Sequence, residues 1–388
     1  MTCIDVRAID QTAIRGQNAI ICGSLELSTT RWVVTMLLPG SEKMSRFNVS
    51  ASAGGEELLR LLGRLRAKVE QQSGSLPGVV MIQEAGLDGF WVHRLLEAHG
   101  IESHVVDAGS VPVPRKRRRG KTDMIDGEAL LRTLLAWRRG EPRVCSMVVP
   151  PSVEEEENRR LVRERETLVS ERTQHGNRIK GLLKSQGITG YDPLRAKRRE
   201  RLERLKTGQG QPLPERLKSQ ILRELDRLEV VMEQIAQIEA DRDALLNALA
   251  ATPNHPVAGL LRLRSLGHAF TSVLWFEGLY RPFANRRQLA SLAGLAPTPW
   301  ISGKIDREQG ISKAGNRRLR TTMIELAWLW LRYQPGSALS CWFRDRVGDK
   351  RGRVRRLAIV ALARKLLIAL WRFATQGIIP EGAVLKAA

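Results

Sequence analysis

The stretch GVVMIQE, residues 78–84, is a short apolar run that begins at a glycine and ends on Glu84. A run of this length, rich in β-branched residues and followed by the turn-like sequence AGLDG, predicts a buried β-strand. A carboxylate at the end of such a strand is costly unless it binds a cation or forms an ion pair. Glu84 is therefore a candidate functional residue as well as the end of a core strand.

The sequence on both sides of this strand alternates strand and helix patterns. Strands are predicted at residues 19–28, 31–38, 46–50 and 102–107, and amphipathic helices at residues 55–71, 89–99 and 123–137. The resulting order is three strands, helix, strand, helix, strand, helix. This is the order of the ribonuclease-H-like α/β fold, in which helices flank a mixed sheet. We therefore predict such a domain over residues 18–150.

Acidic residues occupy three elements that this fold brings to one end of its sheet. Glu26 lies in the first strand, Glu84 ends the fourth, and Asp123 and Asp126 open the last helix, three residues apart on one face. Carboxylate oxygens suit Mg²⁺, and a metal site of this kind acts on phosphodiesters. The alternative for the aspartates is a solvated helix start capped by Thr122, and for Glu26 the water-facing side of an alternating strand.

The charge of the chain predicts a polyanionic partner. It has 63 Lys and Arg against 41 Asp and Glu, a formal net charge of +22 and a pI of about 10.8. The segment PRKRRRGK, residues 114–121, concentrates cations directly before Asp123. We expect its side chains to contact nucleic-acid phosphates, the alternative being a solvated basic loop: Arg115, Lys116, Arg117, Arg118, Arg119 and Lys121.

Residues 151–256 change to long charged helices. Leu161, Leu168 and Leu182 recur at multiples of seven, and a second series from Ile221 to Ile238 recurs at spacings of three and four. This periodicity predicts a helical coiled-coil linker, for which an antiparallel hairpin and an oligomerising stalk are both open. Residues 257–388 are predicted to be a mostly helical domain with several tryptophans.

That last region contains PTPWISGKIDREQGISKAGNRRLR, residues 297–320, in which Ser302 precedes a glycine and a basic helix. A serine can attack phosphorus if its surroundings are electropositive, and we name Ser302 as a candidate nucleophile. Ser312 is the rival, and the alternative for both is a local hydrogen bond in a turn. The nearby cations are candidate phosphate contacts: Lys304, Lys313, Arg317, Arg318 and Arg320.

The remaining signals concern the compartment. Cys3, Cys22, Cys145 and Cys341 show no CxxC spacing, which disfavours a zinc ribbon or a disulfide framework and fits a reducing cytoplasm. The longest apolar stretch, near the C-terminus, is split by Arg364 and Lys365 and is too short to cross a membrane. We expect a cytoplasmic protein without a signal peptide or membrane contact.

Four stretches resemble transposases of the insertion sequence 110 (IS110) family, the DEDD transposases that also carry a catalytic serine. They are SLELSTTRWVV, QEAGLDGFWVHRLLEAHGI, RRGKTDMIDGEAL and FANRRQLASLAGLAPTPWISGKIDREQGISKAGNRRLR. The resemblance implies a RuvC-like nuclease domain, a coiled-coil linker and a small C-terminal transposase domain. It also implies that Glu26, Glu84, Asp123 and Asp126 hold magnesium and that Ser302 links covalently to DNA.

The resemblance further implies a prokaryotic, nucleoid-associated homo-oligomer, a dimer or tetramer. In it one protomer's serine completes another's acidic site, and a structured bridge RNA pairs with donor and target double-stranded DNA. One departure concerns the first acid, which is usually aspartate where this chain has Glu26. Asp5, in the sequence CIDV, is the second candidate for that position.

Two other functions fit the same residues. A RuvC-like junction nuclease would use water in place of Ser302, so that cleavage would survive loss of the serine. An inactive nucleic-acid-binding relative would keep the basic surface without metal-dependent chemistry.

Overall fold

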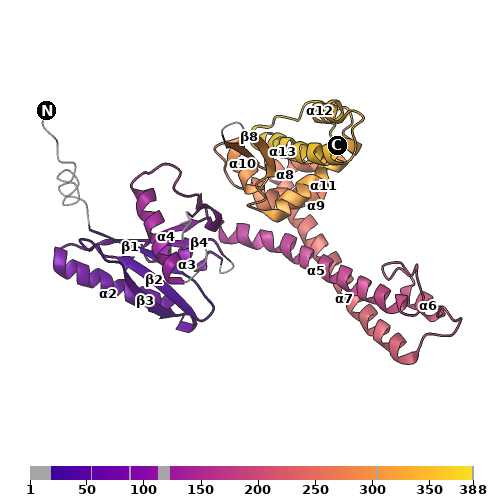
Figure 1. Cartoon of the computed structure of the whole chain (residues 1–388), viewed down its shortest axis with the longest axis horizontal. Helices are drawn as coiled ribbons and strands as arrows, with labels where there is room; N and C mark the ends of the chain where they lie inside the picture. Colours follow the sequence, from indigo (N-terminus) through magenta and orange to yellow (C-terminus); the bar gives the residue numbers. More distant parts are fainter. Residues whose placement is uncertain (1–18, 54, 87–88, 112–122, 303–304, 387–388) are drawn as a thin grey trace. The chain divides into compact units, whose positions relative to one another are not determined.

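The computed structural model describes residues 19–53, 55–86, 89–111, 123–302 and 305–386, with the side chains of residues 123–125 and 300–309 outside that description. The chain divides into an N-terminal unit, Met1–Ser152, and a C-terminal unit, Val153–Ala388 (Figure 1). The predicted further boundary between residues 256 and 257 stays a prediction.

The N-terminal unit contains one mixed sheet of six strands in the order β3-β2-β1-β4-β5-β6. Its strands and helices are β1 Ile20–Glu26, β2 Arg31–Leu37, β3 Ser45–Ser50, α2 Gly55–Ser73, β4 Gly78–Glu84, α3 Trp91–Ala98, β5 Glu102–Val106, α4 Asp123–Arg138 and β6 Met147–Val148. β1 runs antiparallel to β2 and parallel to β4, which is parallel to β5. The predicted order of elements is confirmed, and the short β6 is an addition to it.

The sheet separates two hydrophobic cores. Ile21 and Leu25 of β1 face one core, which contains the apolar side chains of α2 and α3. Cys22, which alternates with them, faces the other core together with Leu130 and Leu134 of α4. Helices therefore cover both faces of the sheet, with α2 and α3 on the first face and α4 on the second (Figure 1).

The start of α4 lies directly against the sheet because residue 127 has no side chain. The hydroxyl of Ser24 in β1 donates to the carbonyl oxygen of Gly127 at 2.6 Å. A Cβ atom at Gly127 would lie 2.7 Å from Oγ1 of Thr35 in β2, closer than real Cβ contacts. Glycine at this position therefore sets how closely the first turns of α4 approach the two central strands.

The C-terminal unit is mostly helical, as predicted. Its elements are α5 Val153–Lys184, α6 Arg198–Glu203, α7 Glu215–Ala251, α8 Pro256–Arg262, α9 His268–Leu274, a π-helical turn Trp275–Leu279, α10 Arg286–Leu292, β7 Pro297–Ser302, β8 Ile305–Ile311, α11 Arg317–Tyr333, α12 Ala338–Val347 and α13 Arg353–Gln376. None of the helices within the described part of the chain has the length and apolar character that a membrane crossing needs.

The two long helices α5 and α7 form an antiparallel hairpin (Figure 1). Arg165 pairs with Glu239 at 2.6 Å, and Arg178 pairs with Glu224 at 3.0 Å. Residue numbers therefore increase along α5 in the direction in which they decrease along α7, as antiparallel helices require. The hairpin was one of the two predicted alternatives for this region. Coiled-coil packing and a role in oligomerisation stay predictions.

We expect the Gly127→Ala substitution to destabilise the N-terminal unit by about 1–3 kcal/mol, because its Cβ has no room against Thr35. Chemical unfolding followed by circular dichroism measures the change.

Gly63→Ala is the matched control, since Gly63 lies within α2 and a Cβ there meets nothing within 4 Å. Alanine should be neutral or stabilising by up to about 1 kcal/mol at that position. Adding Thr35→Ala to Gly127→Ala should recover part of the loss. Equal effects of the two glycine substitutions would contradict the close contact at Gly127.

Candidate active site

Two of the predicted metal-site acids end neighbouring parallel strands. β1 ends at Glu26 and β4 ends at Glu84, and the strand register pairs the residues just before them, Leu25 and Gln83. The two glutamates therefore leave the sheet at the same level, on strands about 4.8 Å apart. Side chains alternate along a strand, so both lie on the face of Ser24, which α4 covers. Both are half-buried.

The other two predicted acids open the helix on that face. Asp126 is half-buried and immediately precedes Gly127, which contacts Ser24, two residues before Glu26. α4 begins at Asp123, one turn earlier, and its side chain lies outside the described structure. The fold thus brings the ends of β1 and β4 and the first turn of α4 to one face of the sheet.

Metal binding by these acids stays a prediction. Within the described structure, which omits the side chain of Asp123, no three His, Cys, Asp or Glu side chains are grouped as a metal ion would need. Asp5, the second candidate for the first acid, also lies outside the described residues. So does the basic cluster of Arg115, Lys116, Arg117, Arg118, Arg119 and Lys121.

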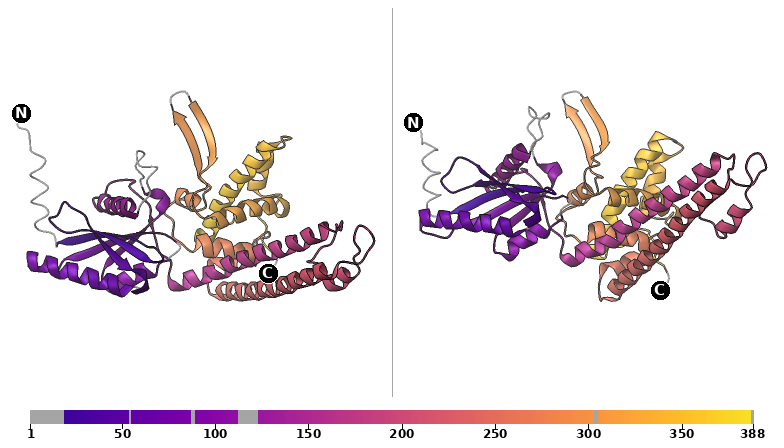
Figure 2. Two further views of the ribbon diagram at one scale, coloured as in Figure 1. Left: turned by 60° about the horizontal axis from the view of Figure 1, so that its bottom comes forward. Right: turned by 90° about the horizontal axis from the view of Figure 1, so that it is seen from below.

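Ser302 ends a β-strand in the C-terminal unit. β7 and β8 are antiparallel and pair Ser302 with Ile305, so the connection consists of residues 303–304, which lie outside the described structure with Lys304 among them. The strands extend away from the helices of their unit (Figure 2). This hairpin was not predicted. The available signal was a two-residue connection beginning with glycine, which is typical of tight hairpin turns.

The base of the serine hairpin depends on close backbone contacts. Gly294 and Gly315 have φ angles of +63° and +100°, where side chains are strained. A Cβ at Gly294 would lie 2.3 Å from the carbonyl oxygen of Ala314, and one at Gly315 would lie 2.4 Å from that of Leu292. The amide of Asn316 donates to the same Leu292 oxygen at 2.6 Å. The two segments that enter and leave the hairpin are therefore held together by their backbones.

The cations predicted to surround Ser302 divide into two groups. Arg318 pairs with Glu166 and, at 3.1 Å, with Glu277, and Arg320 donates to the carbonyl oxygen of Lys313 at 2.8 Å. These two guanidinium groups have partners inside the protein. Lys313 and Arg317 are exposed, and among the described residues neither makes an ion pair, so their charges face solvent. Ser312 is half-buried and directly follows β8.

A buried carboxylate that the sequence analysis did not identify lies behind this segment. The side chain of Glu277, in the π-helical turn, is fully buried. It accepts hydrogen bonds from Nε of Arg163 at 3.0 Å, Nη1 of Arg318 at 3.1 Å and Nδ2 of Asn316 at 2.7 Å. Nη2 of Arg159 lies 3.5 Å away. These contacts join α5, the π-helical turn and the start of α11.

Asn316 has two roles in this arrangement. Its side-chain oxygen accepts a hydrogen bond from the amide of Leu319 at 3.0 Å and caps α11, while its amide group donates to Glu277. Burial raises the pKa of the Glu277 carboxyl, but bonding to Arg163, the charge of Arg159 and the bond from Asn316 outweigh it. The resulting pKa lies below its ordinary value.

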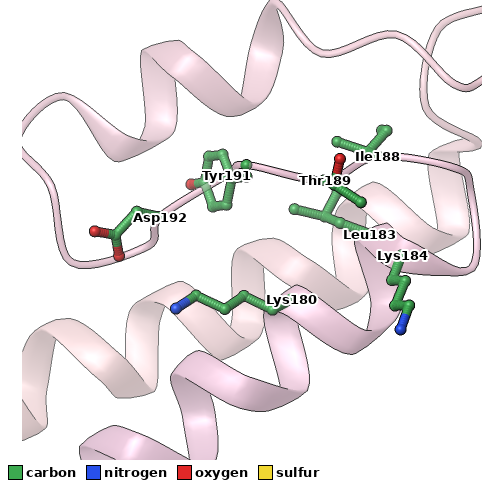
Figure 3. A pocket seen from close by; sticks show the side chains of 8 residues that line it. Lys180, Leu183, Lys184, Ile188, Thr189, Tyr191 and Asp192 are labelled. Atoms are coloured by element: carbon green, nitrogen blue, oxygen red, sulfur yellow. The ribbon is translucent and has the colours of Figure 1, made fainter.

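A separate cavity of about 410 Å³ lies at the tip of the α5–α7 hairpin (Figure 3). Leu183, Ile188 and Tyr191 form part of its wall, with Lys180 and Lys184 nearby. The hydroxyl of Tyr191 donates to a backbone carbonyl at 2.8 Å, and burial raises the pKa of this phenol. None of the predicted catalytic residues lines the cavity, and we assign its wall to the core of the hairpin tip.

We expect Glu277→Gln to destabilise the C-terminal unit by about 3–5 kcal/mol at neutral pH, because the nearly buried guanidinium of Arg159 and the partly exposed ones of Arg163 and Arg318 lose their shared counter-charge. Since the pKa of Glu277 is lowered by folding, its stabilisation is complete well above pH 4.5 and is lost as the pH falls through the lower folded value. Urea unfolding should show a large difference in the free energy of unfolding between variant and wild type at neutral pH, and a smaller difference at acidic pH.

Glu325→Gln is the matched control, because Glu325 is exposed on α11. Its effect should stay within about 0.5 kcal/mol. Equal effects of the two substitutions at neutral pH would show that Glu277 does not hold these elements together.

Comparison with known proteins gives consistent matches over both units. A family model described as "Transposase IS116/IS110/IS902 family" matches residues 268–340, and an IS110 DEDD model described as "Transposase" matches residues 28–187. The first spans the serine hairpin and the whole of α11. The second spans β4 and α4 with Glu84, Asp123 and Asp126, and begins two residues after Glu26.

Curated relatives agree with these models. "Putative transposase y4rJ" of Sinorhizobium fredii is 55% identical over 386 residues, covering 97% of each chain. A "Probable family 20 transposase" of Pseudomonas aeruginosa is 29% identical, covering 79% of this chain and 87% of the relative. "Transposase for insertion sequence element IS1111A" of Coxiella burnetii is 27% identical, covering 77% and 78%. The chain therefore belongs to the IS116/IS110/IS902 family of transposases, enzymes that act on DNA.

Proposed function

We propose that this transposase cuts and rejoins double-stranded DNA by strand exchange through a covalent link between Ser302 and DNA. The acids Glu26, Glu84, Asp123 and Asp126 form a magnesium site that assists the reaction. A bridge RNA guides the choice of donor and target. The observation that carries this proposal is the equal register of Glu26 and Glu84 on parallel strands beneath the first turn of α4.

The strand order supports a ribonuclease-H-like, RuvC-like assignment for the N-terminal unit. The first three strands are antiparallel neighbours, and the fourth and fifth continue the sheet in parallel beside the first. This order requires the carboxyl ends of β1 and β4 to lie side by side. A helix that returns over that edge, as α4 does, adds acids from a third element.

The donor set fits a hard divalent cation. All four proposed ligands are carboxylates, and the three with described side chains are half-buried, so they can be reached from solvent. Magnesium bound there would stabilise negative charge on the phosphodiester. Glu26 and Glu84 lie on neighbouring strands of one sheet, and Gly127 allows α4 to approach closely enough for its aspartates to contribute.

In the serine step the Oγ–phosphorus bond forms as the bond from phosphorus to a deoxyribose oxygen breaks. The serine hydroxyl loses its proton and the departing oxygen gains one. The exposed cations Lys313 and Arg317 would hold neighbouring phosphates, and Lys304, two residues after Ser302 in the sequence, is a further candidate for this role. Rejoining is the reverse attack by the deoxyribose hydroxyl of another strand, which releases Ser302.

The proposal includes partners that follow from the family resemblance. A homo-oligomer would let the serine of one protomer act at the acidic site of another. The excess of cations in the chain supports binding to both DNA and RNA backbones. The basic cluster that precedes Asp123 is the proposed DNA contact of the N-terminal unit.

We expect a protein–DNA adduct that resists detergent when the protein is incubated with its element-end DNA and Mg²⁺. Ser302→Ala should abolish the adduct, because it removes the oxygen that we propose to attack phosphorus. Ser312→Ala, the matched control ten residues along the chain, should preserve it. Gel analysis of labelled DNA and peptide mapping of the adduct provide the measurement.

The same assay separates the alternatives. DNA cleavage that survives Ser302→Ala but is lost in Glu84→Gln would replace the serine mechanism with water-dependent junction cleavage. Cleavage absent from the wild type and every variant, with DNA still bound, would indicate an inactive nucleic-acid-binding relative. Glu70→Gln, an exposed change on α2, controls for the altered charge.

We also expect one discrete RNA to co-purify when the chain is expressed with its native flanking DNA. Sequencing of the bound RNA should return a single structured species encoded in that flank. A mixture of cellular RNA fragments, or no RNA, would contradict guidance while leaving the serine experiment unaffected.

A further inference from the structure

The corner where α12 turns into α13 carries an unusual density of positive charge. We define the α12–α13 corner as residues 344–356, which span the end of α12, a short turn and the first residues of α13. Two aspartates, Asp345 and Asp349, lie among its basic residues, which are Arg344, Arg346, Lys350, Arg351, Arg353, Arg355 and Arg356. All of these basic residues are exposed.

These cations differ from many others in the C-terminal unit because they have no carboxylate partners within the described structure. On the α5–α7 hairpin, for example, Arg178 pairs with Glu224 and Arg199 with Asp226 and Glu229. At the corner, Arg344 donates to a backbone carbonyl at 2.8 Å. Charges of one sign that gather without internal partners repel one another, and a polyanion would offset that repulsion.

The corner is part of a packed structure and not a loose basic segment. Phe343 just before the corner, Val347 within it and Ile359 just beyond it are buried in the main core of the C-terminal unit. Gly348 and Gly352 have φ angles of +50° and +65° and form the turn between the helices. The basic side chains therefore project from a fixed scaffold, which limits the entropy lost when they bind a ligand.

The position of the arginines on α13 is unfavourable for the isolated helix. The amino-terminal end of a helix carries partial positive charge and favours acidic side chains. The first turn of α13 contains no acidic residue and instead has Arg353, Arg355 and Arg356 nearby. Helix stability does not account for these residues, whereas an anion at the helix start would interact favourably with both the arginines and the helix dipole.

An aromatic surface lies next to these charges. The guanidinium of Arg355 lies 5.0 Å from the ring centroid of Trp328 on α11, and Trp328 is 38% exposed. Leu357 on α13 is 56% exposed. Exposed aromatic and aliphatic side chains, beside guanidinium groups that make no ion pair among the described residues, suit the sugar and phosphate groups of a nucleic-acid backbone.

We propose that the α12–α13 corner is a second DNA-binding surface of this transposase, which holds backbone phosphates of duplex DNA. Lys350, Arg351, Arg353 and Arg356 would make the contacts, while Arg355 stays on Trp328. The choice of DNA rests on the proposed function, since both DNA strands must be held while they are exchanged. The site is separate in sequence from the serine segment and the acidic edge, and it would position DNA without reading its sequence.

The test is the salt dependence of binding to a labelled random-sequence DNA duplex, measured by fluorescence anisotropy with the full chain. The triple variant Arg351→Gln, Arg353→Gln, Arg356→Gln should bind roughly tenfold or more weakly at about 0.15 M salt. Its slope of log affinity against log salt should be smaller by about three, since each phosphate contact contributes about 0.9. Lysine at the same three positions should restore most of the slope.

The matched control removes the same charge from α2. Arg60, Arg64 and Lys68 are exposed there, and their triple change to glutamine should leave the slope close to that of the wild type. An unchanged slope in the corner variant, or the same loss in the control variant, would overturn the proposal. A loss confined to an RNA duplex, with DNA binding unaltered, would overturn the assignment to DNA.

The serine-adduct assay distinguishes this surface from the proposed function. Failure of wild-type protein to form the adduct, with duplex binding still lost in the corner variant, would count against serine chemistry and leave the surface established. Normal duplex binding by the corner variant, with an adduct at Ser302 in the wild type, would overturn the proposed DNA-binding surface while supporting the serine chemistry.

Discussion

One buried carboxylate joins the elements on which the serine hairpin depends. Glu277 is enclosed by arginines from α5 and α11 and by Asn316, which also caps α11. A charge removed from water is stable only when its partners fill its bonding positions. The partners of Glu277 come from two separate parts of the chain, α5 and the start of α11. Because Asn316 lies five residues after the end of β8 and caps α11, the same cluster fixes the start of the helix that follows the hairpin.

Much of the N-terminal fold could be predicted because its signals are local. Residues 78–84 and the strands around them have the lengths and patterns of core strands, and the helices show apolar periodicity. Their order leaves few possible topologies, which is why Glu26 and Glu84 could be assigned to one edge before their register was known. The close contact at Gly127 could not be predicted, since it depends on Thr35, far away in the sequence.

Two other parts of the site, the β7–β8 hairpin and Glu277, could not be assigned from the sequence. The sequences of β7 and β8, PTPWIS and IDREQGI, do not alternate apolar and polar residues, and their prolines and glycine are typical of loops. Glu277 lies within the apolar stretch SVLWFEGLY, the same kind of context that drew attention to Glu84. Its arginine partners on α5 are more than a hundred residues away, so sequence alone could mark the acid but not its role.

Because α5 and α7 run antiparallel, the length of the hairpin can change without changing how it joins the rest of the C-terminal unit. Val162 and Leu246 pack with Val257 and Phe276 where the hairpin leaves and rejoins the body, whereas the tip has its own core around Tyr191. Whole helical turns could be added to or removed from both helices together without altering that junction. The hairpin can therefore change its reach among related proteins during evolution, and its tip offers a position for inserting another domain.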